Sequence, residues 1–156
     1  MSLLTPPDAP SPRWTRRLVP LLLAWLLAAA WGSVVQTQWN LQALVGLGVD
    51  IPAAARLSAT GQDLIGFAPV YGGILAVGWL LGLPVASLLA RRWPARRSLL
   101  LAAAAGVGMV AAVRAVDAVA PMPVFIDATR HLPGLLAMAA GAVIAGLLYA
   151  RLTARQ

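Results

Sequence analysis

The stretch Arg91-Arg92-Trp93-Pro94-Ala95-Arg96-Arg97 places four arginines within seven residues, between two apolar runs of membrane length. Cytoplasmic loops of membrane proteins carry an excess of Lys and Arg, and short loops set the orientation of the chain. We therefore expect this loop to lie in the cytoplasm. Pro94 lacks a backbone N–H and biases Trp93 away from helical geometry, so the two flanking helices are expected to be separate and antiparallel.

The composition is typical of a membrane protein. Of the 156 residues, 60 % are hydrophobic and 11 % are charged, whereas soluble domains contain about 25 % charged residues. The length fits a single domain. Cysteine is absent, which excludes disulfides, thiolate metal sites, haem attachment and a cysteine nucleophile.

The formal net charge is +7, and the charged residues divide unequally between the two sides of the predicted membrane. A soluble basic face, the footprint expected of a nucleic-acid-binding protein, is not indicated. Nine basic residues fall on the predicted cytoplasmic side and three on the outer side: Arg13, Arg16, Arg17, Arg91, Arg92, Arg96, Arg97, Arg151 and Arg155 against Arg56, Arg114 and Arg130. The expected partner of the cytoplasmic set is the anionic lipid headgroup.

Four apolar runs are long enough to cross a bilayer. They predict an all-α membrane protein, an up-down bundle of four transmembrane helices with both termini in the cytoplasm. The predicted spans are 18–35, 64–90, 99–116 and 133–150, within a single domain covering 13–156. Residues 1–12 contain four prolines and are predicted to form a disordered cytoplasmic tail.

A signal peptide is the alternative interpretation of the first apolar run. The run is longer than the apolar region of a signal peptide, and Trp31 does not fit a small-residue cleavage site near its end.

The longest predicted loop runs from residue 36 to 63 on the outer side. Within it, Asp50-Ile51-Pro52 resembles a helix start, and the following alanines continue a helix as far as Gly61. We predict a short interfacial helix here. It could act as a lid over a cavity between helices, but we favour a helix that only lets the chain re-enter the bilayer.

Glycines mark the expected helix contacts. Gly78 and Gly82 form a GxxxG pair in the second span, and Gly106 and Gly141 lie on small-residue faces of the third and fourth spans. Small residues let membrane helices approach closely. In a chain so rich in Gly and Ala, packing within the chain is favoured over dimerisation.

Polar residues near the outer ends of the spans predict an outward-facing binding pocket. Asp127, Arg130 and His131 are spaced i, i+3 and i+4, so one helical turn would put them on one face. The helix start at Pro133 adds the positive end of a helix dipole, which favours an anionic headgroup or a quinone carbonyl. The alternative is a solvated helix start that anchors at the headgroups. The predicted ligand-binding set is Gln36, Asp63, Tyr71, Arg114, Asp127, Arg130 and His131.

Several functional classes lack their motifs. The chain has one histidine and no paired acidic motif, so we expect no metal site and no cofactor. No phosphate-binding loop or dinucleotide fingerprint is present. Ser58, His131 and Asp127 could formally supply a catalytic triad, but no local signature accompanies them. The central third of each predicted span is free of ionisable residues, which argues against an ion pump or a proton-coupled transporter acting alone.

The stretch Asp127-Ala128-Thr129-Arg130-His131-Leu132-Pro133, continuing through Gly141 to Arg151, together with Asp63-Leu64-Ile65-Gly66-Phe67 and Tyr71, resembles uncharacterised small four-helix inner-membrane proteins of proteobacteria. The resemblance covers most of the chain. It implies a bacterial inner-membrane location and no particular activity.

These features favour a non-enzymatic integral membrane protein, either an accessory subunit or a lipid- or partner-binding module with a polar outer site. Its expected partners are membrane lipids and a membrane protein or a second copy of the chain, and not nucleic acid. A carrier or channel for a lipid-like or neutral solute is the second hypothesis. A membrane enzyme acting on lipid or quinone is the third.

Replacing the four arginines of residues 91–97 by glutamine should give mixed orientation or poor insertion, because each positive charge near an anionic leaflet contributes about 1 kcal/mol and opposes translocation. A reporter fused after Gln156 measures the orientation, and the wild type should give a cytoplasmic signal. Asp63→Asn is the control and should insert like the wild type, since acidic residues contribute little to orientation. Normal insertion of both variants would refute the topological role of this loop.

Overall fold

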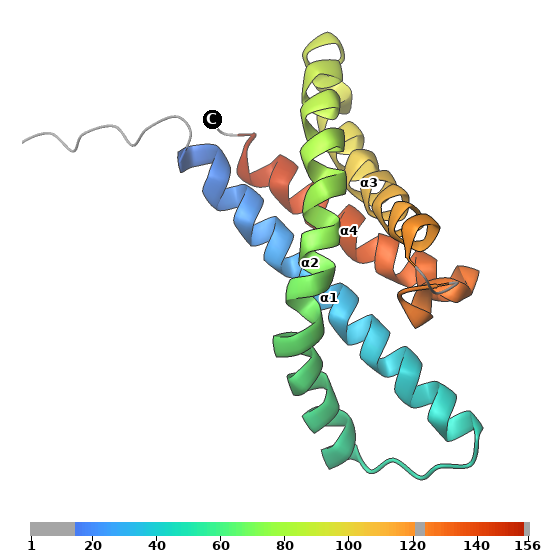
Figure 1. Ribbon diagram of the computed structural model, residues 1–156. Coiled ribbons are helices and arrows are strands. Elements are labelled where there is room, and N and C mark those ends of the chain that lie inside the picture. Colours follow the sequence, from blue (N-terminus) through green and yellow to red (C-terminus); the bar gives the residue numbers. More distant parts are fainter. Residues whose placement is uncertain (1–14, 121–123, 155–156) are drawn as a thin grey trace, which may run out of the picture.

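The computed structural model describes residues 15–120 and 124–154, and the chain in these ranges is almost entirely helical. The predicted tail at 1–12 lies outside the described residues. Four long helices and two short 3-10 helices follow one another: α1 (Thr15–Gly46), α2 (Ala53–Arg92), η1 (Pro94–Arg96), α3 (Arg97–Val119), η2 (Asp127–Arg130) and α4 (Leu132–Leu152). The four long helices are long and apolar enough to cross a membrane (Figure 1), which confirms the predicted helical class and indicates a multi-pass membrane protein.

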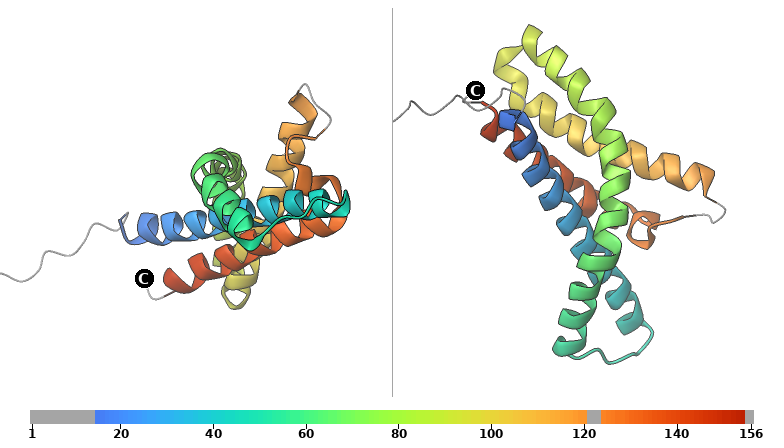
Figure 2. Two further views of the ribbon diagram at one scale, coloured as in Figure 1. Left: turned by 90° about the horizontal axis from the view of Figure 1, so that it is seen from below. Right: turned by 60° about the vertical axis from the view of Figure 1, so that its left-hand side comes forward.

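Each long helix packs against its neighbours in the chain, and α1 closes the ring by packing against α4. In Figures 1 and 2, α1 lies beside α4 and α3 beside α2, while α2 crosses α1 near the middle of both helices. The start of α1, the η1 turn and the end of α4 lie toward the same end. We call it the basic end, after Arg91, Arg92, Arg96 and Arg97. The opposite end, with the 47–52 connection, is the hairpin end.

Pro94 separates α2 from α3 as predicted. α2 ends at Arg92, and Trp93 leaves helical geometry with φ −130° and ψ 72°. The Trp93 N–H still donates to Leu89 O at 3.1 Å, and Pro94 opens the single turn η1. The backbone then enters α3 at Arg97, so the corner occupies only a few residues.

The prediction of a separate short helix between Asp50 and Gly61 is wrong. α2 begins at Ala53 and continues through Gly61 without a break. Its 40 residues correspond to about 60 Å at about 1.5 Å per residue, twice the hydrocarbon thickness of about 30 Å. α1 likewise extends past its predicted span to Gly46.

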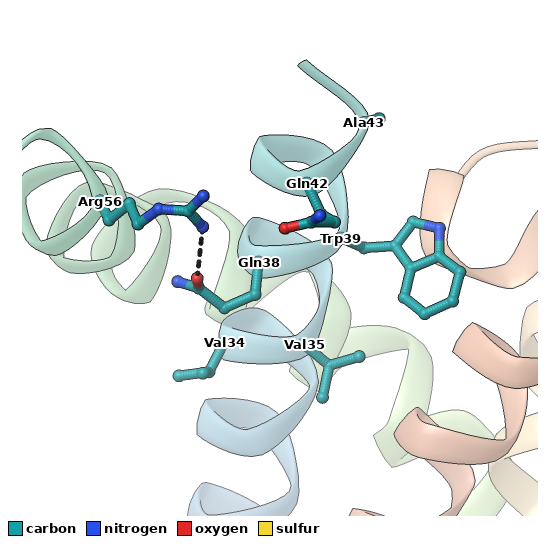
Figure 3. A pocket seen from close by; sticks show the side chains of 7 residues that line it. All are labelled: Val34, Val35, Gln38, Trp39, Gln42, Ala43 and Arg56. Atoms are coloured by element: carbon teal, nitrogen blue, oxygen red, sulfur yellow. Dashed lines mark hydrogen bonds between the residues drawn. The ribbon is translucent and has the colours of Figure 1, made fainter. Parts of the chain in front are cut away.

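Polar contacts between the extended parts of α1 and α2 explain why both helices continue. Gln38 Nε2 donates to Thr60 Oγ1 at 2.9 Å, and Arg56 Nη1 donates to Gln38 Oε1 at 3.5 Å (Figure 3). Gly48, with φ +85°, turns the chain where residues with a Cβ are strained. The result is a helical hairpin that projects beyond α3 and α4 (Figure 1).

The backbones of neighbouring helices touch where glycines replace side chains. A Cβ on Gly78 would lie 2.2 Å from Gly108 O, and one on Gly82 would lie 3.2 Å from Ala104 O. A Cβ on Gly106 would meet a Val143 methyl at 2.7 Å, and one on Gly141 would meet the Trp31 indole at 2.1 Å. The four glycines singled out in the sequence therefore lie at contacts within the chain, between α2 and α3, α3 and α4, and α1 and α4.

Indole N–H groups also join the helices close to these glycine contacts. Trp25 Nε1 donates to Gly72 O at 2.8 Å, Trp31 Nε1 to Ala137 O at 2.9 Å and Trp79 Nε1 to Ala105 O at 3.1 Å. Each bond runs from one helix to a backbone carbonyl of another. In a hydrocarbon environment a polar group needs such an internal partner, so the three indoles both fill space and fix the crossings.

Gly78→Ala should lower the stability of the protein in detergent by about 1–3 kcal/mol, because the added methyl forces the α2 and α3 backbones apart. Gly73→Ala is the matched control on the same helix, since a Cβ there meets nothing within 4 Å. The control should be neutral or stabilising by up to about 1 kcal/mol, the usual gain of Ala over Gly in a helix. Thermal unfolding followed by circular dichroism measures both, and equal effects would contradict the backbone contact.

Candidate functional site

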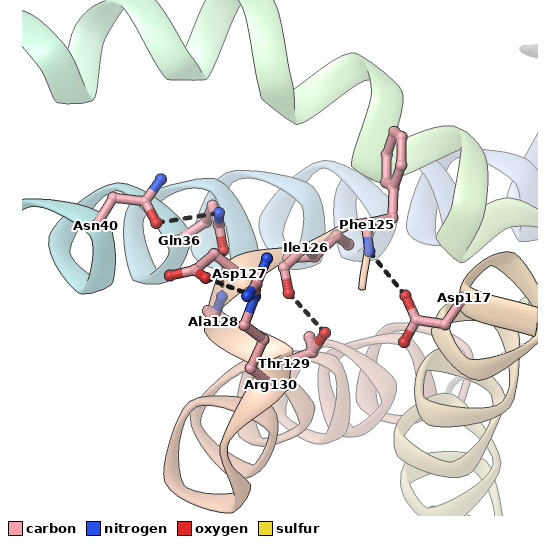
Figure 4. Close-up of polar contacts among 9 residues, drawn as sticks. All are labelled: Gln36, Asn40, Asp117, Phe125, Ile126, Asp127, Ala128, Thr129 and Arg130. Carbon is pink, nitrogen blue, oxygen red and sulfur yellow. Dashed lines mark hydrogen bonds and ion pairs between the residues drawn. The ribbon is translucent and has the colours of Figure 1, made fainter. Parts of the chain in front are cut away.

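Gln36, the first residue of the predicted ligand-binding set, is a structural residue in α1. Its side chain is buried, and its Oε1 accepts the Ala128 N–H at 2.8 Å (Figure 4). Its Nε2 donates to Asn40 Oδ1 at 3.3 Å. Ala128 is fully buried in η2, so without Gln36 its N–H would lack an acceptor within the described residues. Gln36 therefore attaches η2 to α1 and does not face a pocket.

Asp63 also joins two helices. The buried Thr37 hydroxyl of α1 lies 2.7 Å from Asp63 Oδ2 of α2 and 2.8 Å from Ser33 O. A hydroxyl carries one proton, so it donates to one of these two acceptors at a time. The contact lies one residue further along α1 than Gln36, but it points to α2 instead of η2.

Tyr71 fills the crossing of α1 and α2. It is fully buried, stacks on Phe67 with 5.9 Å between ring centroids, and occupies the space that a Cβ on Gly32 would take. Its hydroxyl and the Ser33 hydroxyl are buried without a hydrogen-bond partner in the part of the chain that the structure describes. The ring is thus part of the core and cannot line an outward-facing pocket.

Asp127 and Arg130 share one face of η2, as their spacing predicts. Arg130 Nε lies 2.8 Å from Asp127 Oδ1, and the two side chains are 54 % and 42 % exposed, respectively (Figure 4). Such an exposed pair contributes at most about 1 kcal/mol. His131 is exposed at the start of α4, where its carbonyl accepts the Leu135 N–H at 3.1 Å. Its imidazole makes no hydrogen bond or ion pair to residues 15–120 or 124–154.

Arg114 and Asp117 form a second local pair at 3.5 Å, in which Arg114 is exposed and Asp117 is nearly covered. Asp117 Oδ1 also accepts the Phe125 N–H at 2.9 Å, which attaches the segment before η2 to α3 (Figure 4). The seven predicted residues therefore do not form one pocket. Six of them lie in five separate local arrangements, and the imidazole of His131 takes part in none of these.

A hollow of about 600 Å³ lies beside α1 toward the hairpin end, and none of the predicted residues lines it. We call this hollow the hairpin pocket. It is lined by Val34, Val35, Gln38, Trp39, Gln42, Ala43 and Arg56 (Figure 3). In Figure 3 Arg56 reaches from α2 toward Gln38, while the Trp39 indole projects from α1 away from Arg56. The signal in the sequence is the i, i+3, i+4, i+7 spacing of Val35, Gln38, Trp39 and Gln42 on one helical face.

The chemistry of the hairpin pocket suits binding. It offers one guanidinium, two amides and an indole, and none of its lining residues is a carboxylate, a histidine or a nucleophile. These groups bind an anion or a carbonyl and do not supply an acid–base pair. In residues 15–120 and 124–154, no group of three or more His, Cys, Asp or Glu could hold a metal ion.

Arg97 has a role at the basic end that its place in the loop does not reveal. Its Nη1 donates to Ala150 O at 2.7 Å, and its Nη2 donates to Thr153 Oγ1. The last carbonyls of a helix lack intrahelical donors and carry partial negative charge, so a guanidinium there is stabilising. Arg97 thus caps α4 from α3, whereas Arg91, Arg92 and Arg96 are exposed.

Comparison of the chain with protein-family models, with curated proteins and with solved structures finds no match. Function is therefore inferred from the residues of this chain alone.

Gln36→Leu should destabilise the protein by about 1–3 kcal/mol, because it leaves the buried Ala128 N–H without an acceptor. Gln62→Leu is the control, since Gln62 is exposed and bonds only Ser58 on its own helix at 3.2 Å. Thermal unfolding in detergent gives the difference, and hydrogen exchange of the Ala128 amide gives the local effect. Unchanged exchange at Ala128 would mean that the bond does not hold η2 in place.

Proposed function

We propose that the chain is a non-enzymatic integral protein of the bacterial inner membrane, with both termini in the cytoplasm. It serves as an accessory subunit that binds a membrane partner through the outer part of the α1–α2 hairpin. The observation that carries the proposal is the length of α1 and α2, which continue past α3 and α4 (Figure 2). The arginines at the basic end support the orientation.

The length of α2 supports a position of its first part outside the hydrocarbon. Counted from the basic end, about 20 residues of helix cross the core when upright, and roughly 26 do so at the largest usual tilt of about 40°. α2 has 40 residues, so in the proposed orientation its part before about Gly66 would extend beyond the core. The hairpin would then stand at the outer surface, and Arg56 would lie within reach of a partner there.

The surface of the projecting α1–α2 hairpin is partly apolar. Leu47 is 81 % exposed and Leu57 is 76 % exposed, and Leu44 and Val49 are exposed near them. Apolar residues gathered outside the hydrocarbon typically mark an interaction surface. Exposed apolar side chains inside the hydrocarbon core would simply face lipid. In the proposed orientation, however, Leu57 would lie beyond the hydrocarbon core, because it is near the start of α2.

Arg56 supplies the polar part of this surface. Within the described residues its guanidinium makes one hydrogen bond, to Gln38 at 3.5 Å. This bond is long, and the remaining guanidinium donors are left for another acceptor. The partner that fits presents a carboxylate or phosphate next to an apolar surface. The exposed residue Arg130, by contrast, already pairs with Asp127 at 2.8 Å.

Purification from native membranes in mild detergent, with quantitative mass spectrometry of proteins and lipids, tests this function. The wild type should retain a protein partner at fixed stoichiometry. The double variant Arg56→Ala and Leu57→Ala should retain at least tenfold less, because it removes the cation and the apolar contact together. Circular dichroism should show that the double variant keeps the helical fold.

Arg130→Ala is the matched control, since it removes a different arginine near the expected outer side. It should keep the partner. Loss of the partner with Arg130→Ala alone would return the binding site to η2, the position predicted from the sequence. A wild type that carries lipid but no stoichiometric protein would contradict the accessory role.

A further inference from the structure

A second hollow lies toward the basic end, between α1 and α2, with Tyr149 of α4 beside it. We call it the basic groove. Its volume is about 680 Å³, within the range of about 300–1,000 Å³ of small-molecule sites. Its walls are largely apolar and include Leu21, Trp25, Trp79 and Leu83.

The polar atoms in the apolar wall are already bonded within the protein. The indole N–H groups of Trp25 and Trp79 donate to Gly72 O and Ala105 O at 2.8 and 3.1 Å. The Ser87 hydroxyl donates to Leu83 O at 2.7 Å. The groove therefore presents ring faces and aliphatic groups to an occupant, which suits a hydrocarbon chain.

Two arginines from different helices stand at one end of the groove. Arg17 lies near the start of α1 and Arg91 near the end of α2, and both line the groove. Both are exposed, and neither makes a hydrogen bond or ion pair to the described part of the chain. None of the residues lining the groove is a carboxylate. A phosphate is the group that two such guanidinium ions recognise, through paired N–H···O bonds.

The length of the groove matches one leaflet of a bilayer. Arg91 and Ala76 both line it, and their 15-residue separation spans about 22 Å of helix. One leaflet contributes about half of the hydrocarbon thickness of about 30 Å, with the headgroup layer beyond it. Arg91 at headgroup depth therefore places Ala76 near the middle of the bilayer.

We propose that the basic groove binds one anionic glycerophospholipid of the adjacent leaflet. Its phosphate lies between Arg17 and Arg91, and an acyl chain lies along Trp25, Trp79 and Leu83. An anionic headgroup fits better than a zwitterionic one, because a zwitterionic headgroup brings its own cation toward two uncompensated guanidinium ions. This site is at the opposite end of the molecule from the hairpin and does not depend on a protein partner.

Tryptophan fluorescence tests the proposal in vesicles that contain lipids brominated on the acyl chain, since Trp25 and Trp79 line the groove and bromine quenches indoles at contact. Brominated phosphatidylglycerol should quench wild-type fluorescence at least twofold more than brominated phosphatidylcholine at equal mole fraction. The double variant Arg17→Gln and Arg91→Gln should lose this preference. The matched double variant Arg92→Gln and Arg96→Gln removes the same charge from the same end, outside the groove, and should keep it.

Ala76→Phe provides a second route, because it fills the apolar part of the groove and leaves all charges in place. It should reduce the preference even if the arginine variants insert poorly. Equal loss in both double arginine variants would overturn the proposal, since it would assign the preference to the overall charge of the basic end. Retention of the preference in Arg17→Gln/Arg91→Gln, or in Ala76→Phe, would also overturn it.

Discussion

The direct contact between the backbones of α2 and α3 at Gly78 and Gly108 is the constraint on which the rest of the bundle depends. In lipid, apolar side chains gain little by leaving hydrocarbon for another helix, so close packing and internal hydrogen bonds must hold the helices together. Glycines provide the close approach, and the indole of Trp79 bonds the facing helix at Ala105 O beside it. Because α2 is anchored to α3 here, its crossing with α1 is fixed as well.

The crossing of α1 and α2 explains why the chain has a hollow toward each end. The two helices are closest where Tyr71 packs on Gly32 and Trp25 packs on Gly72. They separate in both directions from this point (Figure 1), which leaves the hairpin pocket on one side and the basic groove on the other. Each hollow contains arginine, so one geometric feature, the crossing, generates two binding surfaces at opposite ends.

Local sequence patterns predicted the four helices, the Pro94 corner and the small-residue positions of helix contact, because hydropathy, proline and glycine act on the nearest turns. Partners far apart in the chain were not predictable in this way. Gln36 bonds Ala128, 92 residues away, and Arg97 caps α4 at Ala150, 53 residues away. The hairpin pocket was missed because its spacing on one face becomes visible only when α1 continues beyond Val35. The outer site was predicted from polar residues expected at a similar depth in the membrane. Most of these side chains instead bond to other groups of the protein.

The central claim is that the α1–α2 hairpin stands outside the membrane while the basic end lies in the cytoplasm. The chain has no cysteine, so single-cysteine variants can be labelled in spheroplasts with a membrane-impermeant maleimide. Leu57→Cys and Gln62→Cys should react, Val77→Cys and Leu81→Cys should be protected, and Ala95→Cys should react only after permeabilisation. Protection at position 57, or reaction at position 95 in intact spheroplasts, would contradict the account.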